Sequence, residues 1–322
     1  MWGFFLCYDT HMKQLLLTVG NIYIDHNIFQ VDSGTELILE SGRDYFAESD
    51  QRVLGGSAVN ASLQARQLGL EVGFIGKTGT DPGAKEVRDL LDEHGIISDL
   101  MSEDASRATS MAINLIHKNG EFIGVHHGDA SRTLSVKDID LTNNLFDSCQ
   151  AVYFGGTAKQ PVLFKDCALL FKRLNDKGIK VFYDPNRFPA GEAITDRSLL
   201  PAQLAHAEGY FPNEDELLQA TGQTSVDEAL DQVIQSGVAF VALKRGAQGC
   251  RIKTRDDDFI VPAKKVEVIT TVGAGDCFNA TFIAYYLEGK SLQECASRAV
   301  TASAIRVSRN TWPPRPAIES YE

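Results

Sequence analysis

Short apolar runs and amphipathic stretches alternate along most of the chain. The apolar runs are rich in β-branched and aromatic residues, which predicts strands at 15–19, 72–75, 152–154, 180–183 and 240–243. In the stretches between them, apolar positions recur at helical spacing, which predicts helices at 58–68, 84–94, 162–177, 214–221 and 226–235. Such alternation is typical of parallel strands joined by crossover helices. We therefore predict a doubly wound α/β layer sandwich, in which ligands bind at the carboxyl ends of the strands.

Two segments depart from this alternation. Residues 35–54 and 109–127 have the pattern of consecutive strands with turns, and residues 118–121 (Lys-Asn-Gly-Glu) carry a hairpin signal. Strands inserted before a regular α/β run do not easily join its parallel core, so we expect a small separate sheet. The alternative is that they are edge strands of the main sheet. A small sheet near the strand ends would act as a lid over a ligand.

Composition limits the partners more than it limits the fold. Hydrophobic residues make up 43% and charged residues 23% of the 322 positions, which is ordinary globular usage. The net charge of -12 opposes binding to nucleic acid and to anionic membranes. We therefore expect the main partner to be a small molecule, drawn in by a local site.

The cysteines and the first residues bear on the compartment. The six cysteines have no C-x-x-C pair or metal-like spacing, so we expect buried thiols in a reducing cytoplasm. The apolar segment 1–8 has no basic flank and is too short to span a membrane. With Met12 as an alternative start, residues 1–11 are interpreted as an N-terminal extension.

The run TTVGAGDCF at 270–278 is the strongest chemical signal in the chain. It lies between an apolar segment, 266–269, and a helical pattern, 278–287, which predicts a strand-to-helix turn. The free N–H groups of a helix's first turn bind anions, so we expect an anion site here. Asp276 then either caps the helix or removes a proton from a group that attacks a bound phosphate.

Two further polar clusters lie near the N-terminus. Asp25 follows the first predicted strand, where it is either a turn residue or a ligand-binding acid. Gly55 and Gly56 open a predicted helix, with Asn60 one turn inside it. Paired glycines allow a ligand to approach the backbone closely, although a tight turn needs them as well.

Long motifs around these residues resemble one family. GGSAVNASLQARQLG (55–69) with GFIGKTGTDPGAKEVRDLLDEHGI (73–96) resembles the N-terminal signature of the ribokinase-like, or phosphofructokinase-B, carbohydrate kinases. TTVGAGDCFNATFIAYYL (270–287) resembles their C-terminal signature, and the similarity runs from about Leu15 to Arg309. The resemblance implies a mostly parallel sheet flanked by helices with a small β-sheet lid. The kinase domain would be residues 12–312, with lid strands from about 30–54 and 109–128 inserted.

The family pattern assigns the acceptor site. It makes Asp25, Gly55, Gly56 and Asn60 sugar-binding residues, and a carboxylate with an amide suits vicinal hydroxyls. The segment DPNR at 184–187 resembles the D-x-N-x-R segment of fructokinase-like members. Arg187 would contact the substrate or the transferred phosphate; the alternative is a surface ion pair.

The pattern also assigns the magnesium and nucleotide sites. Asn213 and Glu216 match an N-x-x-E motif associated with magnesium and its water shell, although alone they would be a helix cap and its capping-box partner. Lys244, Gly246 and Gly249 resemble the nucleotide loop, in a strand-turn-strand context that any β-hairpin shares.

The resemblance gives the Gly273–Asp276 turn the catalytic role. Backbone N–H groups of Ala274, Gly275 and Asp276 would form an anion hole, and the turn would contact the nucleotide through Gly273 and Gly275. Asp276 would be the base for a sugar hydroxyl. The implied reaction is transfer of the γ-phosphoryl group of ATP, with Mg²⁺, to a hydroxymethyl group of a small sugar such as fructose, ribose or 2-keto-3-deoxygluconate.

Two departures from the family pattern concern a monovalent cation. Relatives usually have Asp where this chain has Thr270, and that Asp helps bind the cation in many of them. A later loop, 308–311 (Ser-Arg-Asn-Thr), lacks its usual Gly. These departures argue against potassium activation.

Other functions stay open at this point. A nucleoside kinase would use the same acid and amide, but the first lid segment has no obvious aromatic cluster for base stacking beyond Tyr23, Phe29, Tyr45 and Phe46. A sugar-phosphate kinase would need a basic cluster, and the lid region offers Arg43, Arg52 and Arg107 without one. A catalytically silent sugar- or nucleotide-binding protein would lose the base or the magnesium motif first, and both are present. Lid strands leave exposed edges, so we expect a homodimer through the lid.

Overall fold

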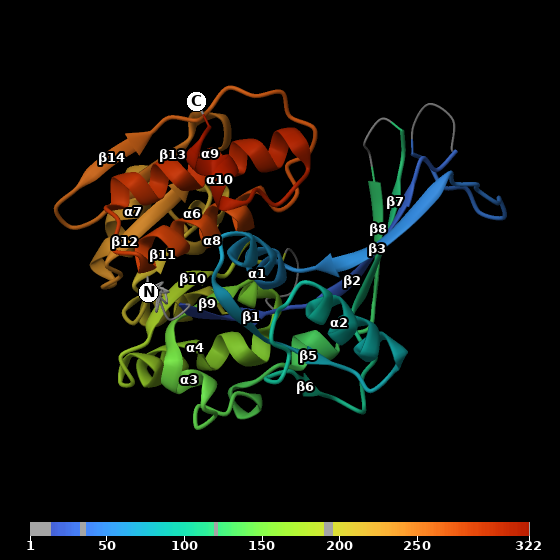
Figure 1. The fold of residues 1–322 in the computed structure, drawn as a ribbon, viewed down its shortest axis with the longest axis horizontal. Coiled ribbons are helices and arrows are strands. Elements are labelled where there is room, and N and C mark those ends of the chain that lie inside the picture. The colour runs from blue at the N-terminus through green and yellow to red at the C-terminus, as the bar shows by residue number, and fades with distance from the viewer. Residues whose placement is uncertain (1–13, 33–36, 119–121, 190–195, 322) are drawn as a thin grey trace, which may run out of the picture.

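The computed structural model describes residues 14–32, 37–118, 122–189 and 196–321. Within them, eight strands form one twisted sheet in the order β14-β13-β12-β11-β10-β9-β1-β4 (Figure 1). Six strands, from β4 to β12, are parallel, and β13 and β14 add an antiparallel edge. The strands are β1 Leu15–Gly20, β4 Glu71–Ile75, β9 Cys149–Gly155, β10 Lys180–Asp184, β11 Gly209–Tyr210, β12 Phe240–Lys244, β13 Cys250–Lys253 and β14 Asp258–Val261. The predicted parallel core is confirmed.

Helices cover both faces of this sheet. One face carries α1 Ser57–Gln67, α2 Pro82–Glu93, α8 Ala274–Leu287, α9 Leu292–Arg309 and the short α10 Arg315–Glu319. The other carries α3 Leu145–Ser148, α4 Pro161–Asn175, α5 Leu200–Leu204, α6 Glu214–Thr221 and α7 Val226–Gln235. Within the described residues, no helix combines the length and the apolarity that crossing a bilayer requires.

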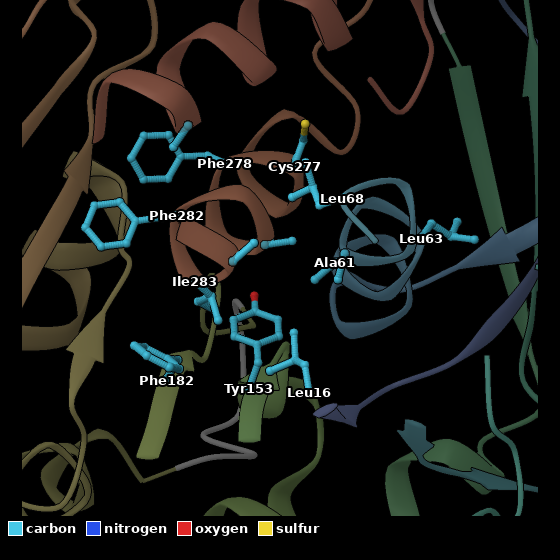
Figure 2. Packing of buried hydrophobic residues seen from close by; sticks show 14 of the residues in the cluster. Leu16, Ala61, Leu63, Leu68, Tyr153, Phe182, Cys277, Phe278, Phe282 and Ile283 are labelled. Atoms are coloured by element: carbon cyan, nitrogen blue, oxygen red, sulfur yellow. The ribbon is translucent and has the colours of Figure 1, made fainter. Parts of the chain in front are cut away.

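Successive residues of the central strands divide between two cores. Leu16, Tyr153 and Phe182 face the layer of α1 and α8, whereas their neighbours in the chain face the layer of α4. Side chains alternate along a strand, so a strand buried on both faces must be apolar at every position. In Figure 2 the Tyr153 ring lies against the sheet, and its hydroxyl points between α8 and α1. The strand core therefore directs a polar group toward the starts of both helices.

A second sheet stands apart from the first. Among the described residues its strands are β2 Tyr23–Phe29, β3 Ser49–Gly55, β7 Met111–Ile116 and β8 Phe122–His127, in the order β3-β2-β7-β8. Figure 1 shows it projecting from the body of the molecule, as a lid would. A two-stranded sheet, β5 Lys77–Thr78 with β6 Ser102–Glu103, lies near its base. The separate sheet is confirmed, and the edge-strand alternative is wrong.

The lid differs from the prediction in its first half. Strand β2 begins at Tyr23, within a segment where we expected a turn, and residues 37–48 form no strand. The sequence of β2, YIDHNIF, has three polar residues in succession at its centre, so apolar and polar positions do not alternate and no buried face is evident. The pairing of β7 with β8 confirms the hairpin, although its turn at 119–121 lies outside the described residues. The N-terminal extension, 1–11, lies outside them as well.

The cysteines of the described residues are buried free thiols. Cys277 is the one next to the signature acid, and burial raises the pKa of its thiol. A thiol held protonated in this way is a poor nucleophile. The expected buried-thiol role holds for these five cysteines, and Cys7 lies outside the described residues.

Candidate active site

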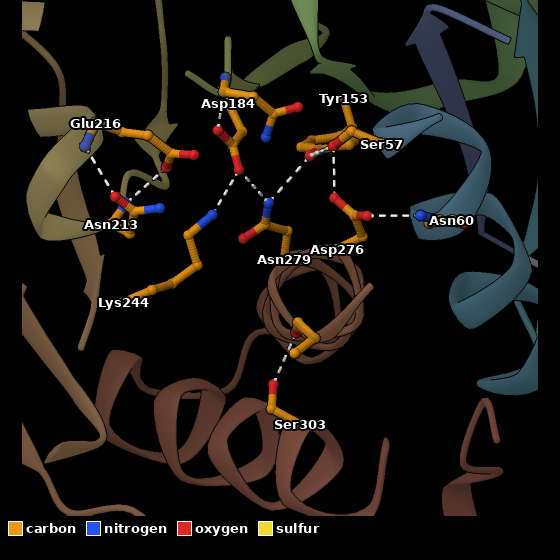
Figure 3. A network of polar contacts seen from close by, with 12 residues as sticks. Ser57, Asn60, Tyr153, Asp184, Asn213, Glu216, Lys244, Asp276, Asn279 and Ser303 are labelled. Atoms are coloured by element: carbon orange, nitrogen blue, oxygen red, sulfur yellow. Dashed lines mark hydrogen bonds and ion pairs between the residues drawn. The ribbon is translucent and has the colours of Figure 1, made fainter. Parts of the chain in front are cut away.

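The site lies where the carboxyl ends of the parallel strands face the first turns of α1 and α8. Figure 3 shows that side chains from both helices, from β9, β10 and β12 and from α6 meet there in one polar network. Strand ends of a doubly wound sheet form such a crevice because crossover helices cover only the faces of the sheet.

Asp276 is the centre of the network on the α8 side. Its carboxylate accepts hydrogen bonds from Ser57 Oγ at 2.5 Å and from Asn60 Nδ2 at 2.8 Å. Burial raises the pKa of Asp276, and the two donors partly oppose this shift. The helix is capped by Gly273 without a side-chain bond, so the capping hypothesis for Asp276 is wrong. The acid instead points across to α1, where it can meet a ligand.

The Gly273–Asp276 turn has the features of an anion site. Gly273 has φ 74°, which favours glycine, and it starts α8. The Ala274 N–H donates to Thr271 O at 3.2 Å, whereas no partner is found among the described residues for the N–H groups of Gly275 and Asp276. Two donors of the predicted three are therefore free for an anion.

The approach to this turn is not a strand. Residues 262–273 form an irregular segment, and the side chains of Val268, Ile269 and Val272 are more than half exposed. The apolar run 266–269 therefore does not enter the sheet. Its backbone is tied to the end of α9, because the N–H groups of Ile269 and Thr270 both donate to Val307 O.

A buried ion pair lies beside the turn. Asp184 Oδ2 accepts from Lys244 Nζ at 2.6 Å and from Asn279 Nδ2 at 2.7 Å, and the Asp184 side chain is only 1% exposed. Burial acts to lower the pKa of Lys244, but the carboxylates of Asp184 and Glu216 raise it above its usual value. Lys244 thus stays charged.

Lys244 also lies against the turn itself. A Cβ built on Gly275 would lie 3.4 Å from the lysine Nζ, so the charged amine is close to the free N–H groups. The hydroxyl of Tyr153 accepts from Asn279 Nδ2 at 3.0 Å and lies 3.5 Å from Ser57 Oγ. This chain of contacts joins the Asp184 pair to the residues that hold Asp276.

Asn213 and Glu216 form the capping box that their spacing indicates. The Asn213 side chain accepts from Glu216 N, and the Glu216 carboxylate accepts from Asn213 N, both at 2.8 Å. Burial, followed by the charge of Asp184, raises the pKa of Glu216, so its carboxylate lies in the same field as the ion pair. Both residues thus cap the start of α6, and this structural role is compatible with a second role in binding magnesium.

The residues fit magnesium better than a transition metal. In the described parts of the chain, no three His, Cys, Asp or Glu side chains converge as a metal site. Mg²⁺ keeps most of its water and binds through one or two carboxylates together with phosphate oxygens. Glu216 beside an anion-binding turn is compatible with that chemistry.

The predicted nucleotide loop is the connection between β12 and β13. It contains a short 3₁₀ turn, Gly246–Gln248, followed by Gly249 at φ 89°. A Cβ on Gly249 would lie 2.0 Å from Val261 O, so this glycine is required by the hairpin alone. Gly246 has open space around it, which leaves its backbone accessible.

Asp25 comes from the lid. It lies on β2 opposite Val53 of β3, and a Cβ on Gly55 would lie 2.1 Å from its Oδ2. Gly56, at φ 115°, lets the chain turn from β3 into α1 against Asn21 O. Burial raises the pKa of Asp25 to about 6, while Lys159 acts to lower it. Gly55 is thus needed for close packing at the carboxylate, and Gly56 for close packing against the Asn21 backbone.

Arg187 does not join the network. Its guanidinium forms an ion pair with Asp215 at 3.0 Å, and the two side chains are 66% and 78% exposed. This is the surface alternative considered for Arg187. Among the described residues we find no polar contact between Arg187 and the network around Asp184.

The chain was compared with known proteins to interpret this geometry. The model of the pfkB family carbohydrate kinases matches residues 13–311. The chain belongs to the pfkB family of carbohydrate kinases. It is therefore a sugar kinase, a phosphotransferase, and kinases of this family use ATP with Mg²⁺.

Individual pfkB relatives are distant. An uncharacterized sugar kinase of Archaeoglobus fulgidus is 27% identical over 71% of this chain and 88% of its own length. A 1-phosphofructokinase of Haloferax volcanii is 29% identical over 91% and 93%. A solved structure of a putative ribokinase II from E. coli in complex with ATP and magnesium has a TM-score of 0.77 at 20% identity, covering 95% and 98%. This last similarity shows the ribokinase fold, and the relatives leave the sugar undetermined.

Several network residues of this pfkB kinase were missed from the sequence. Ser57, Tyr153, Asp184 and Asn279 were not among the predicted site residues, although all four lie between Asp276 and Lys244 (Figure 3). Ser57 had a usable signal, since it lies three residues before Asn60 on the same face of a helix. Asn279 had the same signal, since it lies three residues after Asp276, and Asp184 begins the DPNR segment noted for Arg187; Tyr153 had none in local spacing.

Proposed function

We propose that the protein transfers the γ-phosphoryl group of ATP to a hydroxymethyl group of a small sugar of the fructose, ribose or 2-keto-3-deoxygluconate type. The observation that carries this proposal is the placement of Asp276. Its carboxylate is held by Ser57 and Asn60, while its backbone N–H belongs to the anion-binding turn. Transfer to a hydroxyl needs a base and a charge-stabilising hole next to each other, and one helical turn supplies both.

The acceptor would lie between the lid and the start of α1. Asp25, with its carboxylate against Gly55, would accept hydrogen bonds from sugar hydroxyls, and the glycine backbone lets the sugar approach. The hydroxyl oxygen attacks the γ-phosphorus, the bond to the bridging oxygen of ADP breaks, and the hydroxyl proton passes to Asp276. In a loose transition state the proton moves late, so Asp276 chiefly orients the hydroxyl.

The nucleotide would lie along the other half of the site. Its phosphates would contact the turn at Gly273 and Gly275, where Lys244 lies close to Gly275 and brings positive charge, and the Gly246–Gly249 loop lies at the end of β12. Asn213 and Glu216 would hold magnesium through its water. When bound, the metal neutralises charge on the phosphate oxygens.

Two alternative acceptors are less well supported. For a nucleoside, Tyr23 pairs with His126 at 6.0 Å between ring centroids, and Phe46 is 79% exposed, so these residues make no stack for a base. For a sugar phosphate, Arg43, Arg52 and Arg107 are each paired with a carboxylate. The positive charges that act on the acceptor side are instead Lys159, on Asp25, and Arg132, on Tyr23. Two separate charges, each acting on a different residue, do not make the basic cluster expected for a phosphate group.

A substrate panel tests the proposal. Purified protein with Mg-ATP is offered fructose, ribose, 2-keto-3-deoxygluconate, fructose 1-phosphate and nucleosides, and ADP is measured by a coupled assay. We expect turnover with at least one free sugar, and turnover lower by roughly 10²- to 10⁴-fold with the Asp276→Asn variant. If calorimetry detects sugar binding but no sugar yields ADP, the protein is a binding protein and the proposal fails.

The lid is also where we expect a second copy to bind. Its edge strands are β3 and β8, and Val125 on β8 is 54% exposed. Exposed edges and apolar side chains are commonly covered by another subunit. Light scattering should give a dimer mass, and Val125→Glu should shift it toward the monomer; a monomer at all concentrations would refute this expectation.

A further inference from the structure

Arg306 is a buried cation directly behind the anion-binding turn. It lies in the last turn of α9, and only 8% of the residue is exposed. Its Nε donates to Val272 O at 3.2 Å, and its guanidinium lies 4.1 Å from the centroid of the Trp312 ring. Among the described residues, no carboxylate lies within ion-pair distance of it. A buried charge with only a carbonyl and a ring as partners is unfavourable by itself.

The contacts of Arg306 hold the Gly273–Asp276 turn from the side of α9. Val272 is the residue before Gly273, so the carbonyl that Arg306 holds belongs to the peptide that enters α8. Gly273 is confined on the same side, since a Cβ on it would lie 2.8 Å from the Trp312 ring and 3.5 Å from Arg306 Nε. The next residue of α9, Val307, accepts the N–H groups of Ile269 and Thr270. The end of α9 therefore holds both the segment that precedes the turn, at Ile269 and Thr270, and the turn itself.

Thr270 completes this arrangement. Its hydroxyl accepts the Val272 N–H at 3.2 Å, so a neutral side chain closes the turn at this position. The positive charge at this turn comes from the guanidinium. The positive charge of Arg306 also interacts with Asp276 and Cys277, so it acts on the first turn of α8.

We propose that Arg306 is a built-in cation that positions the anion hole, so that the turn needs no bound monovalent cation. The guanidinium fixes the Val272 peptide and thereby the direction of the Gly275 and Asp276 N–H groups. Its charge also complements the negative charge that accumulates at the turn during transfer. Arg306 is a positioning residue: it acts through the backbone and does not touch the substrate. This inference rests on the proposed phosphoryl transfer.

The test compares three variants in buffer free of sodium and potassium. Arg306→Met keeps the length and removes the charge, Arg306→Lys keeps a charge, and Arg309→Met is the control, an exposed arginine of the same helical turn. We expect Arg306→Met to lower kcat by roughly 10- to 100-fold, less than the loss of a whole oxyanion-hole donor. The acceptor KM should stay close to that of the wild type. Arg306→Lys and a few millimolar guanidinium chloride should each restore part of the activity, whereas Arg309→Met should be unaffected.

The outcomes separate this role from a merely structural one. Wild-type turnover in Arg306→Met overturns the proposal, as does a loss of activity that follows the loss in Tm and is not rescued by guanidinium. Strong activation of the wild type by potassium also overturns it.

A second readout does not depend on turnover. In a Trp2→Phe background, Trp312 is the only tryptophan, and its fluorescence should respond to a non-hydrolysable Mg-ATP analogue. Arg306→Met should weaken that response relative to Arg309→Met; equal responses would count against the proposal. If the wild type binds the analogue yet phosphorylates no sugar, the proposed function fails while the role of Arg306 is still measured.

Discussion

The Asp184–Lys244 pair is the most consequential buried contact in the site, and Lys244→Met is the substitution that tests it. The methionine fills a similar volume but leaves Asp184, 1% exposed, without the cation that contacts it at 2.6 Å. Removing one partner of a buried pair typically destabilises a protein by about 3–5 kcal/mol. Asn279 and the Asn186 N–H still donate to the carboxylate, so we expect the lower end of that range.

The measurement is urea unfolding followed by circular dichroism and fluorescence together, since coinciding transitions justify a two-state analysis. Asp184→Asn should destabilise the protein less than Lys244→Met, because Lys244 keeps the charge of Glu216 nearby. The double variant should be more stable than the sum of the two single changes predicts, by about 2 kcal/mol or more. Lys172→Met, which breaks an exposed pair with Asp176, is the control and should change stability by less than about 1 kcal/mol. Additivity within about 0.5 kcal/mol in the double variant would refute the coupling.

Three further predictions concern the reaction. Asp276→Asn should lower kcat by roughly 10²- to 10⁴-fold while Mg-ATP still binds by calorimetry, and wild-type-like turnover would remove the base assignment. The carboxylate form of Asp25 is lost below its pKa of about 6, so the acceptor KM should rise as the pH falls from 7 to 5. A pH-independent KM would show that Asp25 does not bind the sugar. Because burial raises this pKa above its usual value of 3.8, the same group makes the free protein less stable as the pH increases from about 4 to 6. Gly55→Ala would place a Cβ 2.1 Å from the Asp25 carboxylate. It should therefore raise the acceptor KM at least 10-fold, which corresponds to about 1.4 kcal/mol of lost binding, and leave the ATP KM unchanged. Equal effects on both KM values would indicate general misfolding.

The elements that could be predicted are those with a strong period and two buried faces. The helices α6 and α7 begin and end where their patterns do, and every predicted core strand lies within an observed one. Strand β2 and the segment 266–269 were predicted wrongly for opposite reasons. The first is a lid strand with a polar centre, because the lid buries little on either side. The second is an apolar segment that stays exposed beside the Gly273–Asp276 turn. An apolar segment is expected to be buried in a strand, but tertiary contacts decide both burial and strand pairing, and the local pattern does not contain them.

The network around Asp184 could not be predicted, because its bonds join distant parts of the chain. Lys244 and Asp184 are 60 residues apart, and Ser57 and Asp276 are 219 apart. These residues come together only when the crossover connections have placed their strands side by side in the parallel sheet. Family motifs place the backbone of each residue at the site, but they do not say which side chains bind one another.

Asn60 shows this limit within the site itself. As a sugar ligand, its amide would contact the hydroxyls of the acceptor; in the structure its Nδ2 donates to Asp276. The difference has a geometric cause, because Ser57 and Asn60 lie three residues apart on α1 and share one face, so a carboxylate that reaches one reaches both. An amide that donates through its nitrogen still offers its oxygen to a hydroxyl. In the proposed reaction Asn60 would therefore both orient Asp276 and contact the acceptor, so loss of its amide should lower kcat as well as raise the acceptor KM.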